Sequence, residues 1–256
     1  MKNHLSDYLK LSESNFLENF FNLYLKSSNI TSLMLVDTIS FISKNKKCLR
    51  LILSPKELKA FRSICKKTEY SIVSYPILSE KKGNTWNSLE KDDTNEQTQS
   101  FLVIASLTKD NARSCLNAEI NGDVFLAGQF FDYPKCCIQF YEKFLQYNPQ
   151  NWALSILDSS GNGPYPYYAN RIASGWSGNN FAAELFPCSL KCELAIKIGK
   201  DNERSFYKLG LEKLAEKIKI QSLSSCVIRQ NGSVVKYHKD YKIKNNDNLI
   251  HFTDLT

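Results

Sequence analysis

The stretch CLRLILSPKELKAFRSICKKTEYSIVSYPILS, residues 48–79, decides the fold of the first half of the chain. Both of its ends are short runs rich in Leu, Ile and Val, a composition typical of strands. Its middle begins with Ser54 as a helix cap, Pro55 at the first helical position and Glu57 at the third, which is the signature of a helix start. Strand, helix and strand at this spacing predict a βαβ unit and a small α/β layer.

The neighbouring segments extend this layer. Residues 32–40, SLMLVDTIS, and residues 100–107, SFLVIASL, are short aliphatic runs that we expect to be further strands. Residues 108–120 follow as a capped helix. Residues 80–99 are polar and almost free of aliphatic side chains, which predicts a linker or surface loop.

The second half alternates helical and β signals. Residues 202–220 have apolar side chains at helical spacing and predict one amphipathic helix. Asn231-Gly232 lies between two β-prone runs and predicts a C-terminal β-hairpin with a type I′ turn. The expected fold class is α/β or α+β, with a small mixed sheet, flanking helices, cysteine-bearing helices and this hairpin. We expect two parts, residues 1–95 and 96–256.

Composition limits the classes of protein that the chain fits. Hydrophobic residues make up 43% of its 256 residues, which predicts a folded chain with a real core. The sequence has no stretch of roughly 20 apolar residues and no secretory signal, so we expect a cytoplasmic protein without a membrane partner. Nucleotide-binding and serine-hydrolase chemistries have no motif support, because the Walker, G-x-G-x-x-G and G-x-S-x-G patterns are absent.

Two pairs of cysteines stand out among the eight in the chain. Cys136 and Cys137 lie in the first turn of a helix expected over residues 134–147, with Asp132 as its cap, and Cys188 and Cys192 lie at the start of another expected over residues 189–199. Unpaired backbone N–H groups at a helix start stabilise a thiolate, which is the form that binds metals and attacks electrophiles. The other cysteines, Cys48, Cys65, Cys115 and Cys226, are isolated in apolar or helical surroundings, and we expect them to be buried packing residues.

The spacing of the two pairs favours an iron–sulfur cluster over zinc. Cys188 and Cys192, four residues apart, can point from one helix face to one centre. Cys136 and Cys137 are about 100° apart on a helical wheel, which strains a shared single ion, whereas adjacent cysteines can reach two irons of a larger cluster. Three alternatives remain open: zinc, a metal-free redox or nucleophilic thiol, and packing alone without a cofactor.

Residues 149–187 form a long segment rich in glycine, proline and aromatic residues. Long irregular loops are often binding loops or lids, and the alternative is an aromatic loop packed for stability. If residues 160–187 of this segment cover a small-molecule pocket, the expected substrate contacts are Tyr165, Tyr168, Asn170, Arg171 and Trp176.

The stretches FDYPKCCIQFYEKF, from residue 131, and FPCSLKCELAIKIGK, from residue 186, resemble a prokaryotic family of unknown function. Members of that family carry a Gly-Tyr-Pro-x-Cys-Cys element followed by a Pro-Cys-Ser-x-x-Cys element, and the likeness covers about residues 101–200. The family's glycine is Asp132 in this chain. The matching positions are Tyr133, Pro134, Cys136, Cys137, Pro187, Cys188, Ser189 and Cys192. The resemblance implies a shared site and brings no activity with it.

From these observations we expect a cysteine-site enzyme that depends on a metal or cluster and acts on a small molecule. A metal-free thiol enzyme is one alternative. The net charge of +7 permits another, a non-catalytic module that binds RNA or a protein partner.

Overall fold

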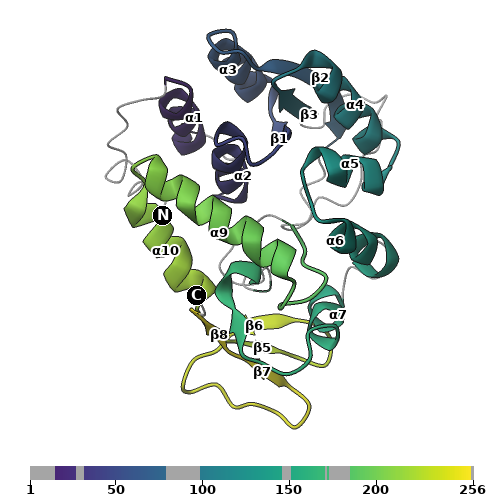
Figure 1. The fold of residues 1–256 in the computed structure, drawn as a ribbon, viewed down its shortest axis with the longest axis vertical. Coiled ribbons are helices and arrows are strands. Elements are labelled where there is room, and N and C mark those ends of the chain that lie inside the picture. Colours follow the sequence, from purple (N-terminus) through teal and green to yellow (C-terminus); the bar gives the residue numbers. More distant parts are fainter. Residues whose placement is uncertain are drawn as a thin grey trace. The chain divides into compact units, whose positions relative to one another are not determined.

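The computed structural model describes residues 15–26, 32–78, 99–145, 151–170, 172 and 185–254. The chain divides into two compact units, one that ends at Phe131 and one that begins at Asp132. Both mix helices with small sheets, which confirms the predicted fold class (Figure 1). No helix in these ranges is long and apolar enough to cross a membrane.

The first unit is built on a three-stranded sheet. Its strands are β1 (Cys48–Leu53), β2 (Ser71–Leu78) and β3 (Gln99–Ser106), in the order β1-β3-β2. Because β3 is antiparallel to both neighbours, β1 and β2 run parallel to each other, and the predicted βαβ unit has a third strand inserted between its two strands. The boundary predicted near residue 95 lies outside the described residues, and β3, which follows it, pairs with both strands that precede it.

The helix between β1 and β2, α3 (Pro55–Cys65), begins as the sequence predicts. The Ser54 hydroxyl accepts a hydrogen bond from the Glu57 backbone N–H at 3.4 Å, and the Glu57 carboxylate accepts one from the Ser54 backbone N–H at 2.8 Å. This reciprocal cap satisfies two backbone donors that the helix itself leaves unpaired, an effect typically worth about 1 kcal/mol. Leu58 and Phe61 then bury the inner face of the helix.

The prediction of a strand over residues 32–40 was wrong, because this segment lies in helix α2 (Ser32–Ile42). Residues 35–41 are buried without a break, so the helix has no polar stripe that would reveal its period. A short, uniformly apolar run fits a buried helix and a buried strand equally well. The other helices described in this unit are α1 (Asn15–Lys26), α4 (Lys109–Ile120), which confirms the prediction over residues 108–120, and α5 (Val124–Phe130).

The second unit combines helices with two small sheets. The antiparallel sheet has the order β6-β5-β7, and β4 pairs with β8 in parallel. Part of the segment 149–187, predicted as a long loop, is regular, with α7, β4 and a 3-10 turn. The elements are α6 (Lys135–Phe140), a π-helical turn (Tyr141–Leu145), α7 (Trp152–Asp158), β4 (Tyr165–Pro166), a 3-10 turn (Tyr167–Ala169), α9 (Glu193–Lys208), α10 (Glu212–Ser222), β5 (Cys226–Ile228), β6 (Val234–Lys236), β7 (Asn248–Ile250) and β8 (Phe252–Thr253).

The amphipathic helix predicted over residues 202–220 is two helices, α9 and α10, divided at Gly210. Gly210 has φ +71°, the left-handed conformation that glycine adopts without steric cost. The Leu211 N–H donates to the Phe206 carbonyl at 2.9 Å and the Gly210 N–H to the Tyr207 carbonyl at 3.1 Å. This pair of bonds is a Schellman motif, which ends α9 before α10 begins.

The predicted C-terminal hairpin is present in β5 and β6, but its turn is longer than expected. The Arg229 N–H donates to the Ser233 carbonyl, and the Gly232 N–H donates to the Arg229 carbonyl, both at 2.9 Å. Gly232 has φ +76°, whereas Asn231 is not in the left-handed region. The loop is therefore a three-residue turn closed by a glycine bulge, and a two-residue type I′ turn was the wrong prediction.

One close backbone approach fixes α9 in the second unit. A Cβ atom added to Gly199 would lie 2.7 Å from the Tyr168 carbonyl oxygen and 2.9 Å from the Tyr168 Cβ. Only glycine therefore lets α9 pack this closely on the 3-10 turn that contains Tyr167 and Tyr168. The contact matters for the cysteines, since Cys192 stands at the start of the same helix.

Candidate metal centre

The first cysteine pair lies at the start of α6. Pro134 occupies the cap position of this helix, with no side-chain cap hydrogen bond, so the prediction that Asp132 caps a helix beginning at Pro134 was wrong. Asp132 instead has φ +55° and turns the chain into the helix. Glycine is the residue best suited to such a left-handed conformation, and aspartate is one of the few others that adopt it. Cys136 and Cys137 follow within the first turn.

The second pair lies before α9 rather than within it. Cys192 is the cap residue of α9, which begins at Glu193, so the helix start predicted at residue 188 or 189 was wrong. Cys188 lies in the preceding turn, where the Cys192 N–H donates to the Ser189 carbonyl at 3.0 Å. The turn is held by the buried Ser160 hydroxyl, which accepts a hydrogen bond from the Leu190 N–H at 2.8 Å.

The structure brings the four sulfurs together. The Sγ atoms are 3.9 Å apart between Cys136 and Cys137, 3.8 Å between Cys136 and Cys192, and 3.7 Å between Cys137 and Cys192. With Cys188 included, all four sulfurs lie within 4.8 Å of one another, close enough to hold a metal ion. The sulfurs of Cys136 and Cys137 thus lie close together, although the two residues are about 100° apart on a helical wheel.

The surroundings of the four sulfurs are unequal. Cys137 is buried against Leu185 and Ala195, whereas Cys136 is exposed and Cys188 and Cys192 are partly buried. The Cys188 backbone N–H donates to the Cys137 sulfur at 3.4 Å. Such amide contacts orient a thiolate and stabilise its charge. The site therefore has one dry side, formed by the core of the unit, and one side open to solvent.

Burial and close contact with neighbouring thiols shift the pKa values of three of the four cysteines, Cys137, Cys188 and Cys192. A hydrogen bond from the Cys137 thiol is the main reason that the pKa of Cys192 falls to about 5, and the Ala195 backbone N–H lowers it further. The same interaction raises the pKa of Cys137, with burial adding to the effect. Burial raises the pKa of Cys188 to about 12. The lowered pKa favours the thiolate form of Cys192, and a cation at the centre would favour loss of the thiol protons of its neighbours.

The other four cysteines serve packing, as predicted. Cys48, Cys65 and Cys115 are buried in the first unit and Cys226 in the second. None of them lies in a metal-competent group of His, Cys, Asp or Glu side chains among the described residues. Their burial fits the behaviour of free cysteine as a small hydrophobic residue.

The aromatic and polar residues predicted as substrate contacts have internal partners where they are described. Tyr165, Tyr168 and Asn170 are buried. The Tyr165 hydroxyl donates to the Gly161 carbonyl, and the Asn170 amide donates to the Ser222 carbonyl. Arg171 and Trp176 lie outside the described residues. As substrate contacts, all five residues stay predictions.

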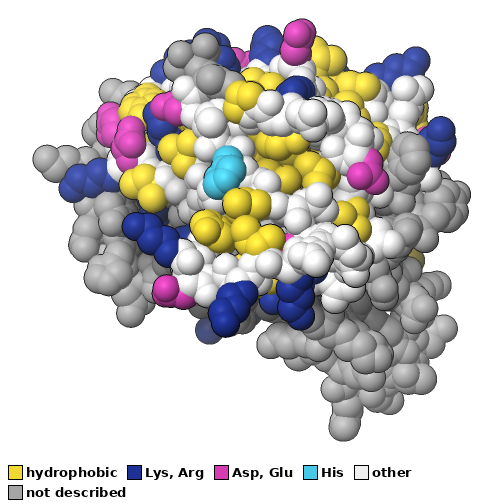
Figure 2. Space-filling view, turned by 90° about the horizontal axis from the view of Figure 1, so that it is seen from below, with side chains coloured by type: hydrophobic (Ala, Val, Ile, Leu, Met, Phe, Trp, Pro, Cys, Tyr) yellow, Lys and Arg dark blue, Asp and Glu magenta, His cyan; other side chains and the backbone are white. Residues whose placement is uncertain are grey.

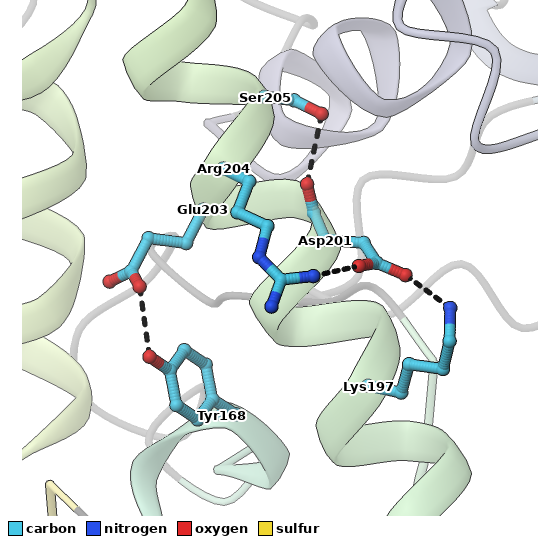
Figure 3. A network of polar contacts seen from close by, with 6 residues as sticks. All are labelled: Tyr168, Lys197, Asp201, Glu203, Arg204 and Ser205. Carbon is cyan, nitrogen blue, oxygen red and sulfur yellow. Dashed lines mark hydrogen bonds and ion pairs between the residues drawn. The ribbon is translucent and has the colours of Figure 1, made fainter. Parts of the chain in front are cut away.

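A carboxylate between two tyrosines was missed by sequence reasoning. Glu203 on α9 accepts hydrogen bonds from the hydroxyls of Tyr167 and Tyr168, the latter at 2.9 Å. Figure 3 shows Tyr168 pointing at Glu203, while Lys197 and Arg204 pair with Asp201 at 2.6 and 3.0 Å. Burial and Glu203 together raise the pKa of Tyr167. The partners are 35 and 36 residues apart along the chain, so no local pattern marks them.

Comparison of the chain with protein-family models, curated proteins and solved structures finds no match.

Proposed function

We propose that Cys136, Cys137, Cys188 and Cys192 bind one tetrahedral metal ion, zinc foremost. The observation that carries the proposal is the spacing of the sulfurs. Thiolates at about 2.3 Å from a tetrahedral ion lie about 3.8 Å from one another. Three of the measured separations are 3.7, 3.8 and 3.9 Å.

The iron–sulfur cluster favoured by the sequence is the second candidate for this site. In a four-iron cluster each thiolate binds its own iron at a different corner, so the sulfurs spread further apart than around one ion. A span of at most 4.8 Å among all four sulfurs supports a single ion over such a cluster. The chemical softness of the thiolate ligands does not decide between zinc and an iron–sulfur cluster, since thiolates bind both.

The geometry supports a structural role more than a catalytic one. Four protein ligands fill a tetrahedral shell and leave no position for water or substrate, whereas catalytic zinc sites keep one position open. The ligands come from the first turn of α6, the turn that precedes α9 and the cap of α9. A bound ion would tie these segments together and add its binding free energy to the folding of the second unit.

The test is metal analysis of protein purified without oxygen. We expect one zinc per chain, no strong visible absorbance, and the intense red-region bands of a tetrahedral thiolate complex after exchange with cobalt. Iron with visible absorbance would replace the proposal by a cluster. Protein that holds neither metal and takes up no zinc on titration would refute both.

Two variants localise the metal. Cys136→Ser removes the exposed ligand with little change in packing, so zinc content should fall while the fold survives. Cys226→Ala removes a buried thiol of the same unit that lies outside the quartet, and its zinc content should equal that of the wild type. Equal zinc in both variants would place the metal elsewhere.

A further inference from the structure

The C-terminal hairpin and the loop after it carry a dense group of cations. Between residues 229 and 247 the chain has five basic residues and two carboxylates, Asp240 and Asp247, a net charge of +3 in a chain of net charge +7. The five basic residues are Arg229, Lys236, Lys239, Lys242 and Lys244. We call them the basic surface. All five are exposed.

These cations make no ion pair with any carboxylate of the described residues. Elsewhere in the same unit, two lysines do pair with a carboxylate, the exposed Lys197 with Asp201 and the half-buried Lys219 with Asp254. Like charges held close together without counterions repel one another, so their clustering costs stability that a bound anion would restore.

The loop that presents the lysines is held in place by contacts of its own. β6 ends opposite Cys226 and β7 begins opposite Ile228, so residues 237–247 run from one end of β5 to the other. The Tyr241 hydroxyl accepts a hydrogen bond from Arg229 Nε at 3.0 Å, and Asp247 accepts one from the Lys244 backbone N–H at 3.1 Å. The basic surface is therefore preorganised, which reduces the entropy lost on binding.

Aromatic side chains lie among the cations. Tyr237 and Tyr241 are half-buried, and Ile243 is 43% exposed. Figure 2 views the molecule from the side of Figure 1 where the sheet β6-β5-β7 lies. Apolar side chains gather in the middle of this face, and most of its lysine and arginine side chains lie toward the edge. Cations around an apolar and aromatic area are the arrangement that single-stranded nucleic acids use, since phosphates meet the cations and bases stack.

We propose that the basic surface binds single-stranded RNA through its phosphates, with Tyr237 and Tyr241 as stacking partners for bases. Lys236, Lys239, Lys242 and Lys244 lie within one stretch of nine residues, so the cations of the surface are close to one another along the chain. A lipid surface fits less well, because binding there relies on a broad apolar face or helix, whereas Ile243 is the one strongly exposed large hydrophobic residue of this loop. The proposal does not depend on the metal.

The experiment measures fluorescence anisotropy of a labelled single-stranded oligouridylate over a series of salt concentrations. Each phosphate contact contributes roughly 0.7 to the slope of log affinity against log salt, so four lysines contribute roughly 3. The variant Lys236→Gln, Lys239→Gln, Lys242→Gln, Lys244→Gln should lose about tenfold or more in affinity and most of that slope. Arginine at the same four positions should keep both.

The matched control removes equal charge from the first unit. Lys56, Lys59, Lys66 and Lys67 are exposed on and just after α3, and their change to Gln should leave RNA affinity within about twofold of the wild type. Urea unfolding of all variants checks that the fold is kept. Equal losses in both glutamine variants would overturn the proposal, as would no loss in either. Tighter binding to duplex DNA or to phosphatidylserine vesicles than to the RNA would also overturn it.

Discussion

Replacement of Gly199 by alanine tests whether the close packing of α9 is needed. Two effects oppose each other at this position. Alanine favours a helix over glycine by about 1 kcal/mol, which would stabilise α9. The new Cβ, however, would lie 2.7 Å from the Tyr168 carbonyl oxygen and 2.9 Å from its Cβ, distances that real Cβ atoms essentially never show.

The clash is with the backbone of Tyr168, so no rotation of a flexible side chain relieves it. Overpacking of this kind costs about 1–3 kcal/mol, and here it also pushes α9 from Tyr168, whose hydroxyl is bonded to Glu203 on the same helix. We expect a net loss of about 1–2 kcal/mol in the free energy of unfolding, measured by urea denaturation. Serine at the same position should lose at least as much.

A control separates the clash from the loss of glycine itself. Gly161→Ala meets no atom within 4 Å, but Gly161 has φ +61°, so its cost of about 1 kcal/mol is one of backbone conformation alone. If Gly199→Ala instead raises stability by the helix-propensity gain of about 1 kcal/mol, the close approach is absent and the reasoning fails.

Three further changes have expected outcomes. Asp132→Gly should raise the free energy of unfolding by about 1 kcal/mol in urea titrations, because the residue has φ +55°, and a lower value would contradict this. Glu203→Gln should cost about 1–2 kcal/mol by the same assay, since it weakens two hydrogen bonds to a carboxylate, whereas Asp201→Asn in the more exposed neighbouring network should cost under about 1 kcal/mol. Burial raises the pKa of Cys226 from 9.0 to about 12, so the folded state keeps this proton while the unfolded state loses it. The contribution of this thiol to stability is complete below pH 9 and falls between pH 9 and 12, by at most about 1.4 kcal/mol per pH unit. In Cys226→Ala, the free energy of unfolding should therefore depend less steeply on pH between pH 9 and 12. An unchanged slope in that range would contradict this prediction.

Local signals in the sequence predicted α3 and the cysteine quartet. The cap of α3 depends on residues three positions apart, Ser54 and Glu57, so the sequence contains all of its information. The cysteine pairs were each visible as a proline followed by thiols, and their joining needed only the expectation that two similar helix starts share one centre. Both signals lie within a few residues, where propensity and capping act.

Features that depend on tertiary context could not be predicted. Residues 32–42 form the helix α2 rather than a strand because of their tertiary surroundings. Their continuous buried apolar run shows neither helical nor strand periodicity of polar side chains. The preference for a cluster rested on the wheel positions of the adjacent Cys136 and Cys137, which do not fix how close their sulfurs lie, and the structure has them 3.9 Å apart. Cys192 is a cap residue and Cys188 lies in a turn, so wheel geometry does not describe that pair. The bonds from Tyr167 and Tyr168 to Glu203 join distant parts of the chain, beyond any local pattern.

The separation of the cysteine pairs along the chain has a consequence for synthesis on the ribosome. Cys137 and Cys192 are 55 residues apart, and translation at about 5–20 residues per second delays the second by roughly 3–11 s. All strands of the first unit precede Cys136, so that unit can fold during the delay. Cys136 and Cys137 are meanwhile without the other two thiols of the quartet. Completion of the quartet is thus a late event, which follows the synthesis of α6, α7 and β4.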